Sequence, residues 1–161
     1  MARHRCHGDG RRFAAVAAFI ADYFGKDVQY IADVAGGQGM LSRLLAKRFR
    51  YECEVIDPRG NVLKGVPSRA EPFLSEMAPY YDLLIGLHPD QALRPLAEAA
   101  LVRPTLIVPC CNFWVPEKLG QQALLAAIEH FLSAAGVTFE RVSFDFSGPH
   151  NIGVATQPPA G

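Results

Sequence analysis

The sequence predicts an α/β fold: a doubly wound, mostly parallel seven-stranded sheet with one antiparallel strand near the C-terminus. Two observations support this prediction. Short apolar runs alternate with helical patterns along most of the chain, which is typical of a parallel sheet covered on both faces. The last two apolar runs are separated only by "SGPHN", which is too short for a helical crossover, so these two strands must pair as an antiparallel hairpin.

The first part of the chain is predicted to form helix, strand, helix and strand. The first helix spans residues 10–24, where apolar residues recur at helical spacing. A buried strand follows at Tyr30–Val34. The next helix covers Met40–Phe49, with leucines on one face and basic residues on the other. A second strand at Tyr51–Ile56 completes the pattern.

The middle of the chain continues the alternation. The turn-rich segment "DPRGNVLKGVPSRAEPF" leaves room only for a short third strand, near Leu63–Val66. Tyr81–Leu87 is predicted to be a buried strand. Gln91–Leu101 is predicted to be a helix, because Pro95 is tolerated in a first helical turn. Thr105–Val108 is the fifth predicted strand.

The C-terminal part is predicted to form a helix over Gln121–Ala135 and then the hairpin, with strands at Val137–Phe146 and Ile152–Thr156. We expect a single domain over residues 1–161 with flexible ends at 1–9 and 157–161, because the chain has 161 residues and half of them are hydrophobic.

Composition excludes several classes of protein. The sequence has no run of about 18 uncharged apolar residues, so a membrane span is not expected. Its polar start lacks the apolar core of a signal peptide, so we expect a cytoplasmic protein. The net charge is zero, and a basic surface for nucleic acid is therefore not implied, although the first twelve residues contain Arg3, Arg5, Arg11 and Arg12.

The four cysteines do not indicate a metal centre. Cys6, Cys53, Cys110 and Cys111 form no Cys-x-x-Cys pair, so no metal site is predicted. A partial site at His4, Cys6 and His7 is the alternative, but this cluster supplies too few ligands for a closed site.

Glycines gather directly after the first predicted strand, in the stretch "YIADVAGGQGMLSRLL". Gly36, Gly37 and Gly39 allow a sharp turn and a close approach of a ligand to the backbone. In doubly wound sheets, ligands bind beyond the carboxyl ends of the strands. Asp57 ends the second predicted strand, 18 residues after Gly39, where a carboxylate can hold both hydroxyls of a ribose. Two ligand classes fit: dinucleotides and S-adenosylmethionine.

The details favour S-adenosylmethionine. A dinucleotide fingerprint, G-x-G-x-x-G, would place Ser42 at its last small position. Asp33 is poorly suited to a pyrophosphate and well suited to a loop around an amino-acid ammonium. The terminal hairpin is also foreign to the dinucleotide fold. A nucleotide-dependent oxidoreductase is therefore the minor alternative.

The stretch "ADVAGGQG" resembles motif I of class I S-adenosylmethionine-dependent methyltransferases, D-x-G-x-G-x-G. Ala35 departs from the motif at its first glycine. "EVIDPRG" resembles the segment that follows motif I, with Asp57 as the ribose acid. The resemblance implies the Rossmann-like methyltransferase fold and S-adenosyl-L-methionine as cofactor. The implied cofactor-binding residues are Asp33, Ala35, Gly36, Gly37, Gly39, Asp57, Pro58 and His88.

"DLLIGLHPD" and "LIVPCCNFW" are similar to a narrower methyltransferase-like family, whose fourth and fifth strands end in G-L-H-x-x-G and V-P-C-C-Y. This chain departs from those motifs at Pro89 and Asp90 and again from Asn112 to Trp114. The candidate catalytic residues are His88, Asn112 and Cys110.

Each candidate has an alternative role. His88 could contact the methionine part of the cofactor, act as a general base, or be a structural histidine. Asn112, with Phe113 and Trp114, could bind a flat amine, although the aromatic rings could also belong to the core. Covalent catalysis by Cys110 or Cys111 is not expected, because no neighbouring group clearly activates a thiol there.

Two acidic residues nearby have competing interpretations as well. Glu71 could hold the adenine amine, but a solvated glutamate is the preferred interpretation. Asp90 is expected to be an N-cap for the following helix.

The function predicted from the sequence is an S-adenosylmethionine-dependent methyltransferase. The acceptor is unresolved, and RNA (tRNA or rRNA) is slightly favoured by the family resemblance and the arginine-rich start. The alternatives are a catalytically inactive S-adenosylmethionine-binding module and a methyltransferase for a small molecule or a protein side chain. Neither the oligomeric state nor the target atom follows from the sequence.

Overall fold

The computed structural model describes residues 10–110, 112–147 and 151–161. Seven strands form one sheet in the order β3-β2-β1-β4-β5-β7-β6. The strands are β1 Tyr30–Val34, β2 Glu52–Ile56, β3 Ser68–Arg69, β4 Leu83–Leu87, β5 Thr105–Val108, β6 Thr138–Ser143 and β7 Ile152–Gln157. The α-helices are α1 Arg11–Tyr23, α2 Met40–Phe49, α3 Leu93–Ala99 and α4 Gln121–Ala134. Three 3-10 helices are η1 Gly25–Asp27, η2 Ser75–Tyr80 and η3 Asp90–Ala92.

The direction of each strand confirms the predicted fold class. Strands β3, β2, β1, β4 and β5 pair in parallel, whereas β7 is antiparallel to both of its neighbours, β5 and β6. β7 is thus the one reversed strand near the C-terminus. The sheet is the mostly parallel, seven-stranded sheet of the Rossmann-like methyltransferase fold.

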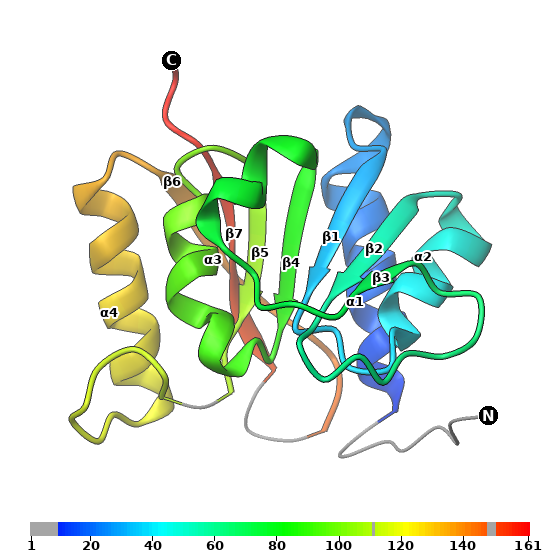
Figure 1. Ribbon diagram of the computed structural model, residues 1–161. Coiled ribbons are helices and arrows are strands. Elements are labelled where there is room, and N and C mark those ends of the chain that lie inside the picture. The colour runs from blue at the N-terminus through cyan, green and yellow to red at the C-terminus, as the bar shows by residue number, and fades with distance from the viewer. Residues whose placement is uncertain (1–9, 111, 148–150) are drawn as a thin grey trace.

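Helices cover both faces of the sheet (Figure 1). Helices α1 and α2 cover one face, where Ile20 and Leu45 pack with Ile31. Helices α3 and α4 cover the other face, where Leu96 packs in the cluster that includes Ala32. Ile31 and Ala32 are neighbours in β1, and successive strand residues point to opposite faces. A strand buried on both sides needs a continuous apolar run, which is why β1, β4 and β5 could be predicted from the sequence.

The third strand differs from the prediction. It lies at Ser68–Arg69, beyond the expected Leu63–Val66. Leu63 is buried, and its backbone N–H donates to the carbonyl of Gln38 in the turn before α2. Gly65, with φ of +85°, then reorients the chain, and pairing with β2 begins only past it. The segment Leu63–Val66 therefore packs against the turn before α2 instead of pairing with β2 as a strand.

Other boundaries shift by smaller amounts. The helix predicted over Gln91–Leu101 starts as the 3-10 helix η3 and becomes α-helical at Leu93, so Pro95 does lie in its first turn. Gln157, expected in a flexible end, is the last residue of β7. Across the described ranges, none of the helices combines the length and the apolar character that a membrane span requires.

Candidate functional site

A cavity of about 330 Å³ lies at the carboxyl ends of β1 and β4. The strand order reverses between these two neighbours, since β2 and β3 lie beyond β1 and β5 lies beyond β4. Ligands of doubly wound sheets bind at this switch point, and small-molecule pockets have volumes of about 300–1,000 Å³. The lining includes Arg12, Asp33, Gly37, Arg59, Leu87 and His88.

The glycine-rich turn between β1 and α2 forms one wall of the cavity. Ala35, Gly37 and Gly39 all have positive φ, at 54°, 59° and 85°. Gly36 has a different reason to be glycine: a Cβ at this position would lie 2.5 Å from Cγ of Asp33. The turn therefore brings its backbone directly over the Asp33 carboxyl group.

Asp33 is a buried carboxyl group that borders the cavity. Its residue is only 2% exposed, and the Ser42 hydroxyl donates a hydrogen bond of 2.7 Å to its Oδ2. Burial raises the pKa of Asp33 to about 6, and the hydrogen bonds from Ser42 offset only part of that effect. The negative charge of Asp57 raises the pKa of Asp33 further. A group in this state favours a cationic or hydrogen-bond-donating ligand, which would stabilise its charged form.

Asp57 lies at the end of β2 and is also 2% exposed. Its Oδ2 accepts the Gly37 N–H at 3.0 Å and Nη2 of Arg59 at 2.6 Å, and its Oδ1 accepts the backbone N–H and Nε of Arg59 at 2.9 and 3.0 Å. Burial raises the pKa of Asp57, but these hydrogen bonds outweigh it and hold that pKa below its ordinary value. Pro58, predicted as a cofactor contact, is exposed.

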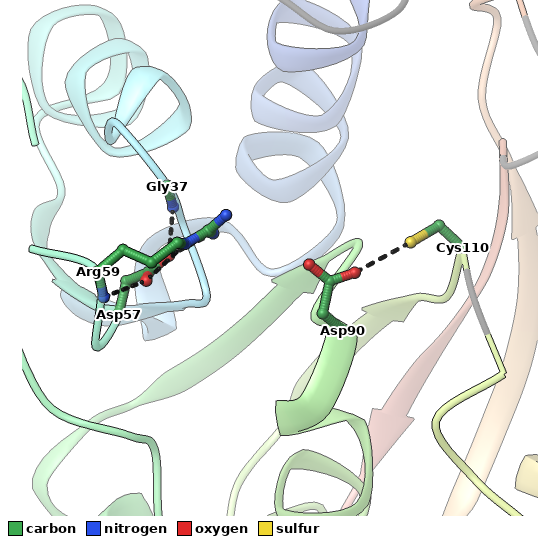
Figure 2. Close-up of polar contacts among 5 residues, drawn as sticks. All are labelled: Gly37, Asp57, Arg59, Asp90 and Cys110. Atoms are coloured by element: carbon green, nitrogen blue, oxygen red, sulfur yellow. Dashed lines mark hydrogen bonds and ion pairs between the residues drawn. The ribbon is translucent and has the colours of Figure 1, made fainter. Parts of the chain in front are cut away.

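A second polar pair lies at the ends of β4 and β5. The Cys110 thiol donates to Oδ1 of Asp90 at 3.5 Å. Figure 2 shows this pair opposite the Asp57–Arg59 pair. Asp90 is the first residue of η3, and its carboxylate accepts from a thiol, so the expected N-cap role is wrong.

His88 precedes this pair and lines the cavity. Its backbone N–H donates to the carbonyl of Val108 at 2.9 Å, which ties the end of β4 to β5. His88 and Asp90 both have positive φ, at 58° and 51°. Non-glycine residues in this conformation cost roughly 1–3 kcal/mol each and are concentrated at functional sites.

Asn112 and the aromatic residues after it lie apart from the cavity. Oδ1 of Asn112 accepts the backbone N–H groups of Trp114 and Val115 at 3.2 and 3.4 Å, and its Nδ2 donates to the carbonyl of Glu117. Trp114 is 9% exposed, with the Arg94 guanidinium 3.6 Å from its ring centroid. Among the described residues, the cavity lining includes neither Asn112, Trp114 nor Cys110.

The remaining predicted residues are placed as follows. The Glu71 side chain is 46% exposed and pairs with Arg69 at 3.7 Å, in accord with a solvated glutamate. Arg11 donates to the Ser147 hydroxyl at 3.2 Å. Cys111 and the His4, Cys6, His7 cluster lie outside the described residues. Over residues 10–110, 112–147 and 151–161, no group of three His, Cys, Asp or Glu side chains could hold a metal ion.

The sequence prediction missed Arg59 as a site residue. Its guanidinium lines the cavity and forms an ion pair with Asp57. The available signal was the tetrapeptide Asp-Pro-Arg-Gly, which has the residue preferences of a type I turn. Such a turn brings the side chain of its third residue near that of its first.

Comparisons with known proteins give the same fold. No protein-family model matches the sequence, and no curated protein sequence matches it. The chain is similar to the solved structure of the sugar N-methyltransferase KedS8 from Streptoalloteichus sp. (TM-score 0.59, 14% identity, 98% of this chain and 96% of that chain). It is also similar to the methyltransferase domain of bacterial CtHen1-C (TM-score 0.62, 13% identity, 92% and 97%).

A third similar structure is a Methanococcus maripaludis protein assigned as an S-adenosylmethionine-dependent methyltransferase (TM-score 0.63, 13% identity, 100% of this chain and 98% of that chain). At these identities the similarity establishes a shared fold. It covers 92–100% of this chain and 96–98% of the three similar chains.

Proposed function

We propose that this protein is an S-adenosylmethionine-dependent methyltransferase that binds its cofactor in the cavity at the β1–β4 switch point. The main supporting observation is the pair of buried carboxyl groups, Asp33 and Asp57, at the ends of adjacent strands, with the glycine-rich turn between them. The Gly37 N–H donates to Asp57, so the turn and the second carboxylate form one unit.

The residues present fit this cofactor. Asp33 is a buried carboxyl group whose charged form a nearby ammonium would stabilise. The backbone at Gly36 and Gly37 permits close approach, because neither residue has a side chain. Asp57, which pairs with the cavity-lining Arg59, is the candidate partner of the ribose hydroxyls, and Arg12 at the start of α1 lines the cavity, where a guanidinium can bind a carboxylate. The cofactor supplies an electrophilic methyl group on its sulfonium.

The protein's own contribution to transfer is positioning and proton removal. Alignment of two reacting groups in one site can lower a barrier by about 7–11 kcal/mol. His88 lies in the cavity wall, where its imidazole can orient an acceptor or accept its proton.

The acceptor that we favour is RNA, such as tRNA or rRNA. Support comes from the family resemblance and from the arginines of the N-terminal segment. Arg12 lines the cavity, and Arg59 extends to its exposed rim. Guanidinium groups form bidentate hydrogen bonds to phosphates, and such contacts position a nucleic acid without reading its sequence.

Binding and transfer must be tested separately. Calorimetry should detect S-adenosylmethionine binding and no NAD binding. The Asp57→Ala variant should bind S-adenosylmethionine about 2 kcal/mol more weakly while staying folded, because charge-assisted hydrogen bonds to the ribose are lost. Unchanged affinity in this variant would remove Asp57 from the cofactor site.

The acceptor is tested with labelled methyl transfer into fractionated RNA, protein and small metabolites. Small molecules belong in the assay because the similar KedS8 protein is a sugar N-methyltransferase. Label in RNA would support the favoured acceptor, and label in another fraction would replace it. Cofactor binding without transfer into any fraction would favour the inactive binding module.

A further inference from the structure

The Asp57 carboxylate is fully engaged by the chain itself. Each of its two oxygens accepts two hydrogen bonds, three of the four from Arg59 and the fourth from Gly37. An ionised carboxylate has about four acceptor positions. The described residues alone therefore use all of them, and a ribose diol cannot bond to Asp57 while Arg59 stays in place.

The local sequence explains why Arg59 takes this position. The Gly60 N–H donates to the Asp57 carbonyl at 3.2 Å, which closes a four-residue turn. Pro58 occupies the second position, which it favours, and Gly60 adopts φ of +64°. Within the turn, Oδ1 of Asp57 accepts the Arg59 N–H, as aspartate side chains commonly do two residues on. The Arg59 side chain thus starts beside the carboxylate that it pairs with.

The two partners differ in exposure. The Asp57 side chain is 2% exposed, whereas the Arg59 side chain is 62% exposed. Water can replace the carboxylate around the exposed guanidinium, and the buried carboxylate keeps the backbone N–H donors of Gly37 and Arg59 when the guanidinium leaves. The Arg59 side chain can therefore move into solvent, and the negative charge of Asp90 also acts on its guanidinium.

We propose that Arg59 competes with the ribose diol of the cofactor for Asp57, so that Arg59 sets the cofactor affinity of the free protein. The inference rests on the proposed function, because it assigns Asp57 to the ribose. Binding then requires the guanidinium of Arg59 to leave both carboxylate oxygens. The backbone bonds from Gly37 and Arg59 can persist, so Asp57 keeps its orientation when the side chain has left.

The test is calorimetry of S-adenosylhomocysteine with the wild type and Arg59→Ala. We expect the variant to bind about 2- to 5-fold more tightly, as for an ion pair whose guanidinium is largely exposed. Arg69→Ala is the matched control, because Arg69 also pairs with a carboxylate, Glu54 at 2.8 Å, but lies on β3 away from the cavity lining. Its affinity should equal that of the wild type. Arg59→Lys keeps the positive charge but cannot form the bidentate pair, so its affinity should lie between those of the wild type and Arg59→Ala.

Salt gives a second measurement. Raising NaCl from roughly 0.05 M to roughly 0.5 M screens the Arg59–Asp57 pair. The advantage of Arg59→Ala over the wild type should therefore shrink as salt rises. An advantage that stays constant with salt would contradict electrostatic competition.

Two nucleosides test whether Arg59 competes with the ribose hydroxyls themselves. Arg59→Ala should bind adenosine more tightly than the wild type does, and it should show no such gain for 2′,3′-dideoxyadenosine, which lacks both hydroxyls. Equal gains for the two nucleosides would overturn the inference, since Arg59 would then block the cavity by its bulk. Equal affinity of wild type and Arg59→Ala for S-adenosylhomocysteine would overturn the inference alone. Absence of binding by every variant would overturn the proposed function and the inference with it.

Discussion

Among the described residues, two non-glycine residues with positive φ line the cavity, Ala35 and His88, and a third, Asp90, lies two residues after His88. Ala35 occupies the position where the resembling motif has glycine, and it adopts the left-handed conformation that glycine would adopt there without strain. The departure from the motif therefore preserves the shape of the turn. Its cost is local strain, which a single substitution can measure.

Ala35→Gly should raise the free energy of unfolding by about 0.5–1 kcal/mol. Relief of left-handed strain contributes about 1–2 kcal/mol, and the larger freedom of glycine in the unfolded chain cancels part of it. Urea denaturation measures the difference. Ala126→Gly in α4 is the control, because Ala126 is an exposed helical residue and its replacement should lower stability by about 1 kcal/mol. If Ala35→Gly lowered the free energy of unfolding as Ala126→Gly does, this result would contradict backbone strain at Ala35.

Asp33 predicts a pH dependence of stability. Its folded pKa of about 6 lies above the ordinary value of 3.8. The folded state therefore favours the protonated form, and the contribution to stability is fully present below about pH 4 and is lost as pH rises through about 6. The loss amounts to about 2–3 kcal/mol.

Asp33→Asn should remove this dependence. The stability of the variant relative to the wild type should rise by about 2–3 kcal/mol between pH 4 and pH 8, as measured by urea denaturation over that range. Asp22→Asn, at an exposed position of α1, should show a flat difference. A flat difference for Asp33→Asn as well would mean that Asp33 is ionised across the range.

The segment between β5 and α4 is organised by one amide. Asn112 bonds to the backbone of three residues within the same segment, and Trp114 is fixed beneath Arg94 and edge-on to Phe131. These contacts give Asn112 a structural role. A direct role at the acceptor stays a prediction.

Asn112→Ala should lower the free energy of unfolding by about 1–3 kcal/mol, because buried or half-buried N–H groups lose their acceptor. The affinity for S-adenosylhomocysteine should not change. Asn112→Asp keeps an acceptor for Trp114 and Val115 and should lose less stability. If Asn112→Ala kept full stability and lost turnover, Asn112 would belong to the acceptor site instead.

The sequence was most informative for elements buried on both faces. β1, β4 and β5 could be located in the sequence, as could Asp33 near the end of β1 and Asp57 directly after β2, because continuous apolar runs end at or beside these polar residues. β3 was misplaced because its segment packs by contact with the β1–α2 turn, which is distant in sequence. Arg59 and the Asp90–Cys110 pair were missed for a related reason: the direction of a loop side chain depends on the turn geometry and on neighbours from other strands.

At the scale of the molecule, two apolar clusters on opposite faces of one sheet support the cavity at the carboxyl ends of β1 and β4. A ligand that binds only the folded protein stabilises the whole domain by mass action. S-adenosylhomocysteine at about 100 times its dissociation constant should add about 2.7 kcal/mol, which thermal denaturation detects as a higher midpoint. Asp57→Ala should shift less at the same concentration. A wild-type midpoint that is independent of this ligand would contradict the assigned cavity.

The place of β7 has a consequence for biosynthesis. β7 lies between β5 and β6, so β6 joins the sheet only through a strand that the ribosome makes later. Thr105 of β5 pairs with Thr156 of β7, which is distant in sequence, and pairings between distant segments slow folding. A nascent chain that has emerged only as far as Ser143 exposes the apolar edge of β5 and an unpaired β6. Open edges of this kind pair with other chains, so we expect the growing polypeptide to depend on chaperones until β7 inserts.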